Sequence, residues 1–370
     1  MKKLLPEVCT IQYGFPFDSA KFSDSNGMPL IRIRDVVRGC SETYTTEEYK
    51  SEYIVHENDL LIGMDGEFNI AKWGKTPALL NQRVCRLAPN DSIDKDYLFY
   101  FMPVALKRIE EKTPFVTVKH LSAKELNKIE IPVLSLEEQR KIAETLSKVD
   151  ELIAFREQQL AKLDELVKAR FVEMFGDINV NNKKWMTYPL GELCTIVRGG
   201  SPRPIERYLG GTIPWIKIGD ATTGENIYLN STKEYIIQEG VKKSRMIKAG
   251  SLIFANCGVS LGFARIITFD GCIHDGWLAM EDIDEKLDKI FLLYSLNQMT
   301  EYFRKTAPAG TQPNLNTNIM KMHRQIVPPM EMQKAFISFV KCADRQKQIV
   351  QQSLDKLELM KKALMQEYFG

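Results

Sequence analysis

The chain has 370 residues, a formal net charge of +2, 44% hydrophobic residues and 26% charged residues. This is an ordinary globular composition, and the length suits two domains of usual size. No apolar run is long enough to span a membrane, and Pro6 and Glu7 end the charged opening segment too early for a signal peptide. The seven scattered cysteines lack a CxxC pair, so we expect reduced thiols in a cytoplasmic protein. A net charge near zero neither requires nor excludes nucleic acid.

Residues 1–134 have the pattern of a mixed domain in which strands dominate. Short β-branched runs separated by Gly, Pro and Asn predict strands over residues 9–13, 29–37, 59–63 and 80–87. Helices are expected over residues 97–111 and 122–128, before a last strand over 129–133. We therefore place a first domain at residues 1–134.

Residues 135–176 predict one long helix. Apolar residues recur at alternating four- and three-residue steps, which is typical of a coiled coil, and only Arg156 and Arg170 interrupt them. At 1.5 Å per residue, about 40 residues form a rod roughly 60 Å long. The predicted interface residues are Ile142, Leu146, Val149, Ile153, Leu160, Leu163 and Val167.

The second half of the chain repeats the first. Residues 5–14 align with 190–199, and Pro29 and Asp35 align with Pro214 and Asp220, at an offset of 185. We align residues 61–62 with residues 252–253 at an offset of 191, and Leu121 with Leu315 at an offset of 194. Strands are expected over residues 214–218, 251–255 and 262–268, with a helix over 289–305. The second domain is placed at residues 177–328.

A second long helix is predicted over residues 329–370, at an offset of 194 from the first. Two helices with the same imperfect apolar stripe are expected to pair, with Lys347 and Lys361 as the interruptions in the second. Its predicted interface residues are Phe336, Val340, Val350, Leu354, Leu357 and Leu364.

The short connection after the first helix predicts an antiparallel pair. Fewer than 15 residues separate Gly176 from the first strand near Leu190, which is at most about 50 Å of extended chain. A parallel pair would require the chain to return along a rod of roughly 60 Å. The fold class is therefore α+β: two tandem domains joined by two antiparallel helices, with a pseudo-twofold internal repeat.

Motifs of catalysis are missing from the sequence. It contains no GxGxxG after a strand, no GxxxxGK[ST] and no Asn/Asp-Pro-Pro-aromatic motif of amino methylation. The four histidines stand singly, without metal-ligand spacing. We expect no catalytic residue, no cofactor and no metal, and instead a scaffold that carries binding surfaces.

The best binding candidates lie in loops rich in glycine, arginine and amides. Glycine lets the backbone approach a ligand, arginine can fork onto guanine edges or phosphates, and asparagine and glutamine suit adenine edges. For each residue the alternative, a solvated turn or strand face, stays open. The candidates are Arg32, Arg34, Lys72, Lys75 and Arg83 in the first copy and Arg198, Ser201, Arg203, Arg207, Tyr208, Gln312 and Asn314 in the second.

Four features together resemble the specificity subunit of Type I restriction–modification systems. They are the duplicated layout, the segment at residues 199–220, the entry to the first long helix at residues 131–143 and the two long helices. The resemblance implies that each domain recognises one half of a split site in double-stranded DNA. It also implies that the helices act as spacer and dock for two methyltransferase subunits, to which ATP-dependent restriction subunits can be added. S-adenosylmethionine and ATP would then belong to those partners.

Two other functions remain open from the sequence. One is the same kind of subunit in a Type IIB-like methylase–nuclease, which only the neighbouring genes would distinguish. The other is a coiled-coil adaptor that binds proteins alone. DNA affinity that falls with salt would separate the adaptor from the two DNA-binding functions.

Overall fold

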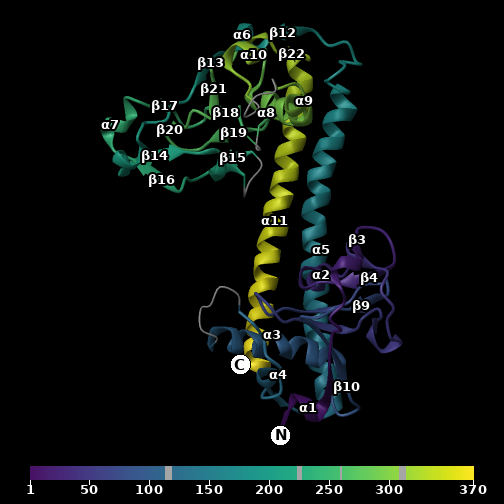
Figure 1. The fold of residues 1–370 in the computed structure, drawn as a ribbon. Coiled ribbons are helices and arrows are strands. Elements are labelled where there is room, and N and C mark those ends of the chain that lie inside the picture. The colour runs from purple at the N-terminus through teal and green to yellow at the C-terminus, as the bar shows by residue number, and fades with distance from the viewer. Residues whose placement is uncertain (113–118, 223–226, 259–260, 308–313) are drawn as a thin grey trace. The chain divides into compact units, whose positions relative to one another are not determined.

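The computed structural model describes residues 1–112, 119–222, 227–258, 261–307 and 314–370 (Figure 1). The chain divides into two compact units: residues 1–158 with 351–370, and residues 159–350. We call them unit 1 and unit 2. Each unit therefore combines a globular portion with part of both long helices. Within the described residues, the helices are too short or too polar to cross a membrane.

The described part of unit 1 has three sheets. In the third, β4 and β9 run parallel, whereas the other pairs are antiparallel. The strand orders are β1 (Lys2–Leu4) with β11 (Glu130–Pro132); β2 (Cys9–Tyr13), β10 (Val84–Pro89), β7 (Leu60–Gly63), β8 (Ile70–Lys72); and β3 (Phe22–Ser23), β5 (Tyr44–Thr45), β4 (Met28–Ile31), β9 (Ala78–Leu80), β6 (Ile54–Val55). The helices are α1 (Leu5–Val8), α2 (Ile33–Arg38), α3 (Lys95–Lys112), α4 (Ala123–Leu126) and the first part of α5 (Leu136–Phe175).

Unit 2 also has three sheets among its described residues, but β15 (Tyr228–Leu229) adds a second parallel pair, with β19 (Ala264–Ile267). The parallel pair of β4 and β9 is matched by β14 and β20. The strand orders are β12 (Thr187–Pro189) with β22 (Arg324–Ile326); β13 (Thr195–Arg198), β21 (Trp277–Glu281), β18 (Leu252–Ala255), β19 (Ala264–Ile267), β15 (Tyr228–Leu229); and β16 (Glu234–Ile236), β14 (Leu209–Ile216), β20 (Gly271–Ile273), β17 (Arg245–Ile247). The helices are α6 (Leu190–Leu193), α7 (Gln238–Val241), α8 (Lys289–Gln298), α9 (Thr300–Thr306), α10 (Thr317–Met322) and much of α11 (Met330–Phe369).

Three predicted elements are wrong because side chains or turns interrupt them. The strand over residues 29–37 ends at Ile31, since the buried Asp35 carboxylate accepts the Arg32 amide at 2.8 Å and starts α2. The strand over residues 80–87 is split by a turn in which Arg83 has φ +69°. The helix over residues 289–305 breaks at Met299. There Thr300 Oγ1 donates to the Gly262 carbonyl at 2.6 Å, which ties the break to the chain before β19.

The register of the sheets corrects one alignment of the repeat. Gly63 pairs with Val84 in unit 1, and Ala255 pairs with Trp277 in unit 2. Thr10 pairs with Ala88 and its counterpart Thr195 pairs with Glu281, so β10 matches β21 at an offset of 193 and Val84 corresponds to Trp277. The match between β7 and β18 is therefore offset by 192, so that Leu60 corresponds to Leu252, and the predicted offset of 191 is wrong. A slip of one residue exchanges the two faces of a strand. Leu60 and Leu252 both face the helix-covered cores, as the corrected alignment requires.

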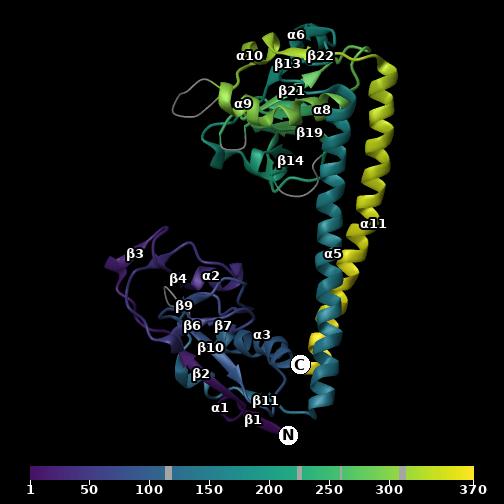
Figure 2. The ribbon, with the colours of Figure 1, turned by 90° about the vertical axis from the view of Figure 1, so that its right-hand side faces the viewer.

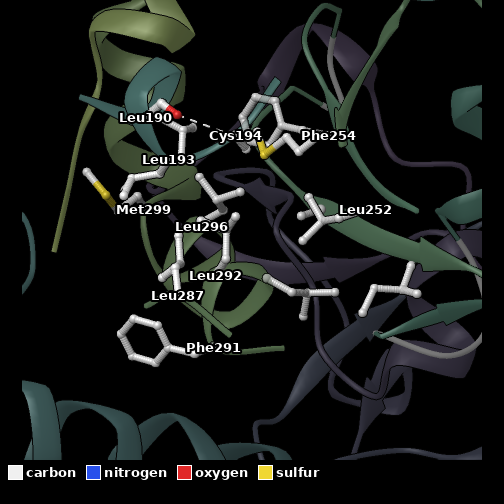
Figure 3. Close-up of a cluster of buried hydrophobic side chains, with 14 of the residues drawn as sticks. Leu190, Leu193, Cys194, Leu252, Phe254, Leu287, Phe291, Leu292, Leu296 and Met299 are labelled. Atoms are coloured by element: carbon white, nitrogen blue, oxygen red, sulfur yellow. Dashed lines mark hydrogen bonds between the residues drawn. The ribbon is translucent and has the colours of Figure 1, made fainter. Parts of the chain in front are cut away.

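The largest core of unit 2 lies between its five-stranded sheet and the helices (Figure 3). Leu252 and Phe254 of β18 pack there with Leu292 and Leu296 of α8. The two long helices complete this core, because Phe336 lies 5.3 Å from Phe171, measured between ring centroids.

In unit 1, α3 lies beside the C-terminal end of α11 (Figure 2), and the Phe369 ring is 5.3 Å from the Tyr97 ring. The start of α5 joins the same core through Leu146. The end of α11 therefore meets the start of α5 in unit 1, while the start of α11 meets the end of α5 in unit 2. The predicted antiparallel pairing is confirmed.

The predicted interface residues of the helices all lie buried or half-buried. Leu146, Val149, Val167, Phe336, Val340 and Leu354 are buried; Ile142, Ile153, Leu160, Leu163, Val350, Leu357 and Leu364 are half-buried. The charged interruptions find partners across the pair. Lys361 binds Asp150 at 2.6 Å in unit 1, and Lys347 binds Asp164 in unit 2. Arg156 Nε donates to Ser353 Oγ at 3.1 Å.

A buried glutamine fixes the start of each long helix to its domain. The Gln139 Oε1 atom accepts the Asp94 amide at 2.8 Å, and its Nε2 donates to the Leu134 carbonyl at 2.9 Å. Gln333 makes the equivalent bonds with the Asp288 amide and the Pro328 carbonyl, both at 2.8 Å. Both side chains are 0% exposed. The duplication thus extends to single hydrogen bonds.

Candidate nucleic-acid interface

In each domain, four chain segments meet at the ends of three neighbouring strands: β2, β7 and β10 in unit 1, and β13, β18 and β21 in unit 2. We call this region the loop cluster: residues 13–15, 64–66, 81–83 and 119–120 in unit 1, and residues 198–201, 256–258, 274–276 and 314 in unit 2. Equivalent backbone hydrogen bonds hold both clusters. The Met64 amide donates to the Arg83 carbonyl at 2.9 Å, and the Asn256 amide donates to the Gly276 carbonyl at 3.0 Å. The two domains therefore present different side chains from one framework.

A glycine is required at the same position in each cluster. A Cβ atom on Gly14 would lie 2.0 Å from the Asn81 carbonyl oxygen, and one on Gly199 would lie 2.1 Å from the His274 carbonyl oxygen. No side chain fits at such a distance. The glycine allows the strand end to pack against the turn that carries the polar side chains.

Asp275 organises the predicted arginines of unit 2. Its Oδ1 atom accepts the Ser201 hydroxyl at 2.8 Å, and its Oδ2 lies 3.8 Å from the Arg203 guanidinium. Arg198 Nε donates to the Asp275 carbonyl at 3.0 Å. Arg198 and Arg203 remain exposed. Asp275 thus contacts two arginines and a hydroxyl: its carboxylate contacts Arg203 and Ser201, and its backbone carbonyl accepts from Arg198.

His274 adds a half-buried imidazole to this group. Burial lowers the pKa of His274 below its usual 6.5, and the nearby Asp275 carboxylate only partly opposes that shift. The Gly276 amide donates to His274 Nδ1 at 2.9 Å, and Asp275 Oδ1 lies 3.0 Å from the same nitrogen. These contacts hold the imidazole beside the predicted arginines.

Tyr208 and Arg207 lie on the neighbouring loop of unit 2. The Tyr208 hydroxyl accepts the Lys243 ammonium at 2.6 Å, and that ammonium lies 4.9 Å from the ring centroid. The tyrosine is half-buried and held in place, whereas Arg207 is exposed. Lys243 extends the basic character of this loop toward the loop cluster.

Two amides meet in the unit 2 cluster. Asn256 Nδ2 donates to Asn314 Oδ1 at 3.2 Å, and Asn314 forms a backbone bridge with Cys257. This contact orients the predicted Asn314. Gln312, the other predicted adenine reader, lies outside the described residues.

The unit 1 cluster carries charged residues at the equivalent positions. Arg83 NH1 lies 3.1 Å from His120 Nδ1, and Asp65 Oδ1 lies 2.6 Å from that same nitrogen. Asp65 Oδ2 is 3.7 Å from Arg83 Nε. Arg83 is exposed and adopts φ +69°, a strained value for a residue with a side chain. Such strain is concentrated at functional sites.

The other predicted residues of unit 1 lie outside its loop cluster. Arg32 and Arg34 are exposed around the start of α2, and Lys75 is exposed in the turn after β8. Lys72 is half-buried and binds Asp96 at 2.8 Å. Arg32 aligns with Lys217 of unit 2, and each starts a short helical turn through an aspartate three residues later. The structure brings Arg83, but not these four, into the cluster.

Sequence reasoning missed the residues that support the predicted ones. Asp65, His120, Asn256, His274 and Asp275 belong to the clusters but were not singled out. The signal that could have found them is the repeat itself, since Asn314 corresponds to His120. Within the described residues, no group of three or more His, Cys, Asp or Glu side chains could hold a metal ion.

Two copies of one domain, with different polar side chains on the same loops, define a tandem recognition protein. The family model described as "Type I restriction modification DNA specificity domain" matches residues 1–165 and again residues 182–359. The chain belongs to this family, and it carries the domain twice. It is a DNA-specificity subunit and not itself an enzyme.

Curated relatives have the same description. The specificity subunit of the Type I restriction enzyme EcoBI from Escherichia coli is 40% identical over 164 residues, which cover 44% of this chain and 34% of that protein. The MjaVIII specificity subunit from Methanocaldococcus jannaschii is 25% identical over 342 residues, which cover 85% of this chain and 79% of that protein.

Solved structures share the fold over the whole chain. The S subunit of a Type I restriction–modification system from M. genitalium aligns with a TM-score of 0.56 and 16% identity, over 100% of this chain and 96% of that one. A chain from a structure of Type I restriction–modification complex assembly aligns with a TM-score of 0.65 and 16% identity, over 100% and 97%.

Proposed function

We propose that the loop cluster of each unit reads one half of a bipartite site in double-stranded DNA. The observation that carries this proposal is the identical backbone framework with different polar side chains, Arg83 with Asp65 and His120 in unit 1 and Asn314 with Asn256 in unit 2. Arginine suits guanine edges and asparagine suits adenine edges in the major groove. Two clusters that share backbone hydrogen bonds but carry different polar side chains suit two different half-sites.

The long helices serve as spacer and dock. They set the separation of the half-sites, and they hold two methyltransferase subunits on the two similar surfaces that the duplication supplies. The partners bring S-adenosylmethionine and, where restriction subunits join the complex, ATP. The protein acts in the cytoplasm, where cellular DNA is accessible in bacteria and archaea such as the sources of the relatives above.

Sequencing of methylated positions in DNA from cells with and without this chain tests the proposal. We expect one bipartite motif that disappears with the chain. The Arg203→Ala variant should relax one half of the motif by about 1–3 kcal/mol of discrimination and leave the other half unchanged. Lys248→Ala is the matched control, because Lys248 is exposed in unit 2 and binds Asp270 outside the loop cluster.

Two results would contradict the proposal. A motif that is unchanged by loss of the chain would exclude a specificity function in that methylation. Phosphate contacts make DNA affinity fall as salt rises. If the DNA affinity of the purified complex does not fall in this way, the protein-only adaptor is favoured.

A further inference from the structure

Unit 2 contains a cavity of about 270 Å³ where its sheet meets the long helices. Asp164 and Lys168 of α5, Arg265 of β19, Tyr294 of α8 and Lys347 of α11 are among its lining residues. None of the loop-cluster residues lines it. The cavity is smaller than the usual site for a small-molecule ligand and suits one inserted side chain.

Arg265 is an uncompensated buried cation in the wall of this cavity. The residue is 9% exposed, its guanidinium stacks 4.7 Å from the Phe263 ring, and its NH1 donates to the Ala264 carbonyl at 2.8 Å. Its Nε is buried without a hydrogen-bond partner. Of the carboxylates that the structure describes, none lies within ion-pair distance of it. Burial lowers the pKa of Arg265 to about 10, so the group stays cationic at neutral pH.

The surrounding charges do not compensate Arg265. Asp164 is engaged by Lys347, and Lys168 adds a further exposed cation. Burial and the Asp164 and Asp344 carboxylates raise the pKa of Tyr294, which keeps its hydroxyl protonated. A buried charge without a partner is costly, and a planar guanidinium binds a carboxylate through two parallel hydrogen bonds. The cavity is therefore complementary to a carboxylate.

Unit 1 has no counterpart of this feature. The register of β8 against β7 places Ala71 where unit 2 has Arg265. The neighbouring polar groups of unit 1 are paired within the unit: Lys72 binds Asp96 at 2.8 Å, and the Tyr100 hydroxyl donates to Asp150 at 3.0 Å. The two otherwise matching surfaces beside the long helices are therefore chemically different.

We propose that the Arg265 cavity receives an acidic side chain of one methyltransferase subunit, and that this contact makes the unit 2 dock the tighter of two. The inference rests on the proposed function, which supplies the partner. The first methyltransferase subunit then binds at unit 2 through Arg265, and the second binds at unit 1. The size of the cavity and its position against both long helices favour a protein side chain over a DNA phosphate.

Titration of the full chain with the purified methyltransferase subunit, followed by native mass spectrometry, tests this inference. For the unaltered chain we expect two binding steps of unequal affinity. Arg265→Met should weaken the tighter step by about 30-fold or more, as expected when one partner of a buried charge pair is removed, and leave the other step unchanged. Lys168→Met is the matched control, because it removes an exposed cation from the same cavity wall and should change neither step by more than a few-fold.

The outcomes separate this inference from the proposed function. No binding of the methyltransferase subunit by the unaltered chain would refute the dock itself. Two binding steps that Arg265→Met leaves unchanged, or weakens equally, would overturn the inference alone, as would an equal loss with Lys168→Met. Should Arg265→Met fail to fold, hydrogen exchange on the unaltered chain decides: the first bound subunit must protect α8 rather than α3.

Discussion

Replacement of Gln139 by leucine tests how the long helix is fixed to the first domain. Leucine has a similar volume but cannot form the hydrogen bonds of the side chain to the Asp94 amide and to the Leu134 and Ser92 carbonyls. The Gln139 side chain is 0% exposed, so leucine at this position would leave these backbone groups facing an apolar side chain. Each buried backbone group that is left without a partner costs about 1–3 kcal/mol. After partial relaxation we expect a loss of about 3 kcal/mol in the free energy of unfolding.

Urea denaturation of the full chain, followed by circular dichroism and by hydrogen exchange of each unit, measures this loss. Gln333→Leu should produce a similar loss in unit 2, because Gln333 makes the same kind of bonds. Arg140→Leu is the control next in sequence, since Arg140 is exposed and only 3.9 Å from Asp94. We expect that control to stay within about 0.5 kcal/mol of the unaltered chain. If Gln139→Leu also stays within that range, the buried glutamine does not hold the helix to the domain.

Three further predictions concern recognition, pH and spacing. Arg83→Ala should relax only the half-site that unit 1 reads, as measured by sequencing of methylated DNA. Arg38→Ala is the control, because Arg38 is an exposed arginine at the end of α2 that binds Glu42 outside the loop cluster. A change in the other half-site would contradict the assignment. Burial lowers the pKa of His323 to about 4, from an ordinary value of 6.5. The contribution of the neutral imidazole to the free energy of unfolding is therefore fully present above pH 6.5 and falls toward pH 4, by about 2 kcal/mol at pH 5. The free energy of unfolding of His323→Phe should lack that dependence on pH. A third change deletes residues 153–159 and 352–358, which lie between the Asp150–Lys361 and Asp164–Lys347 pairs. The helices should shorten by about 10 Å, and the preferred spacer between the half-sites by about three base pairs, unless the accompanying rotation of one half-site about the DNA axis abolishes binding. Unchanged methylation of the original site would contradict the spacer function.

The sequence by itself determined the long helices and the tandem plan. A period of 3.5 residues depends on local spacing alone, so α5 and α11 could be placed to within a residue or two. Antiparallel pairing followed from the short connection after Gly176, because chain length limits reach whatever the fold. Matching motifs at Gly14 and Gly199 exposed the duplication, since each glycine meets the same steric demand.

Only the tertiary structure decided which side chains meet. Asp65, Arg83 and His120 lie in three separate loops, and they come together because β7, β10 and the chain before Leu121 share one set of backbone hydrogen bonds. The predicted alignment of β7 with β18 was wrong by one residue, which shows why the meeting of these side chains could not be predicted. Two adjacent apolar positions look alike in sequence, but they face opposite sides of a strand. The unpaired charge of Arg265 is likewise invisible in sequence, because packing between distant elements buries the guanidinium and pairs Asp164, which lines the same cavity, with Lys347.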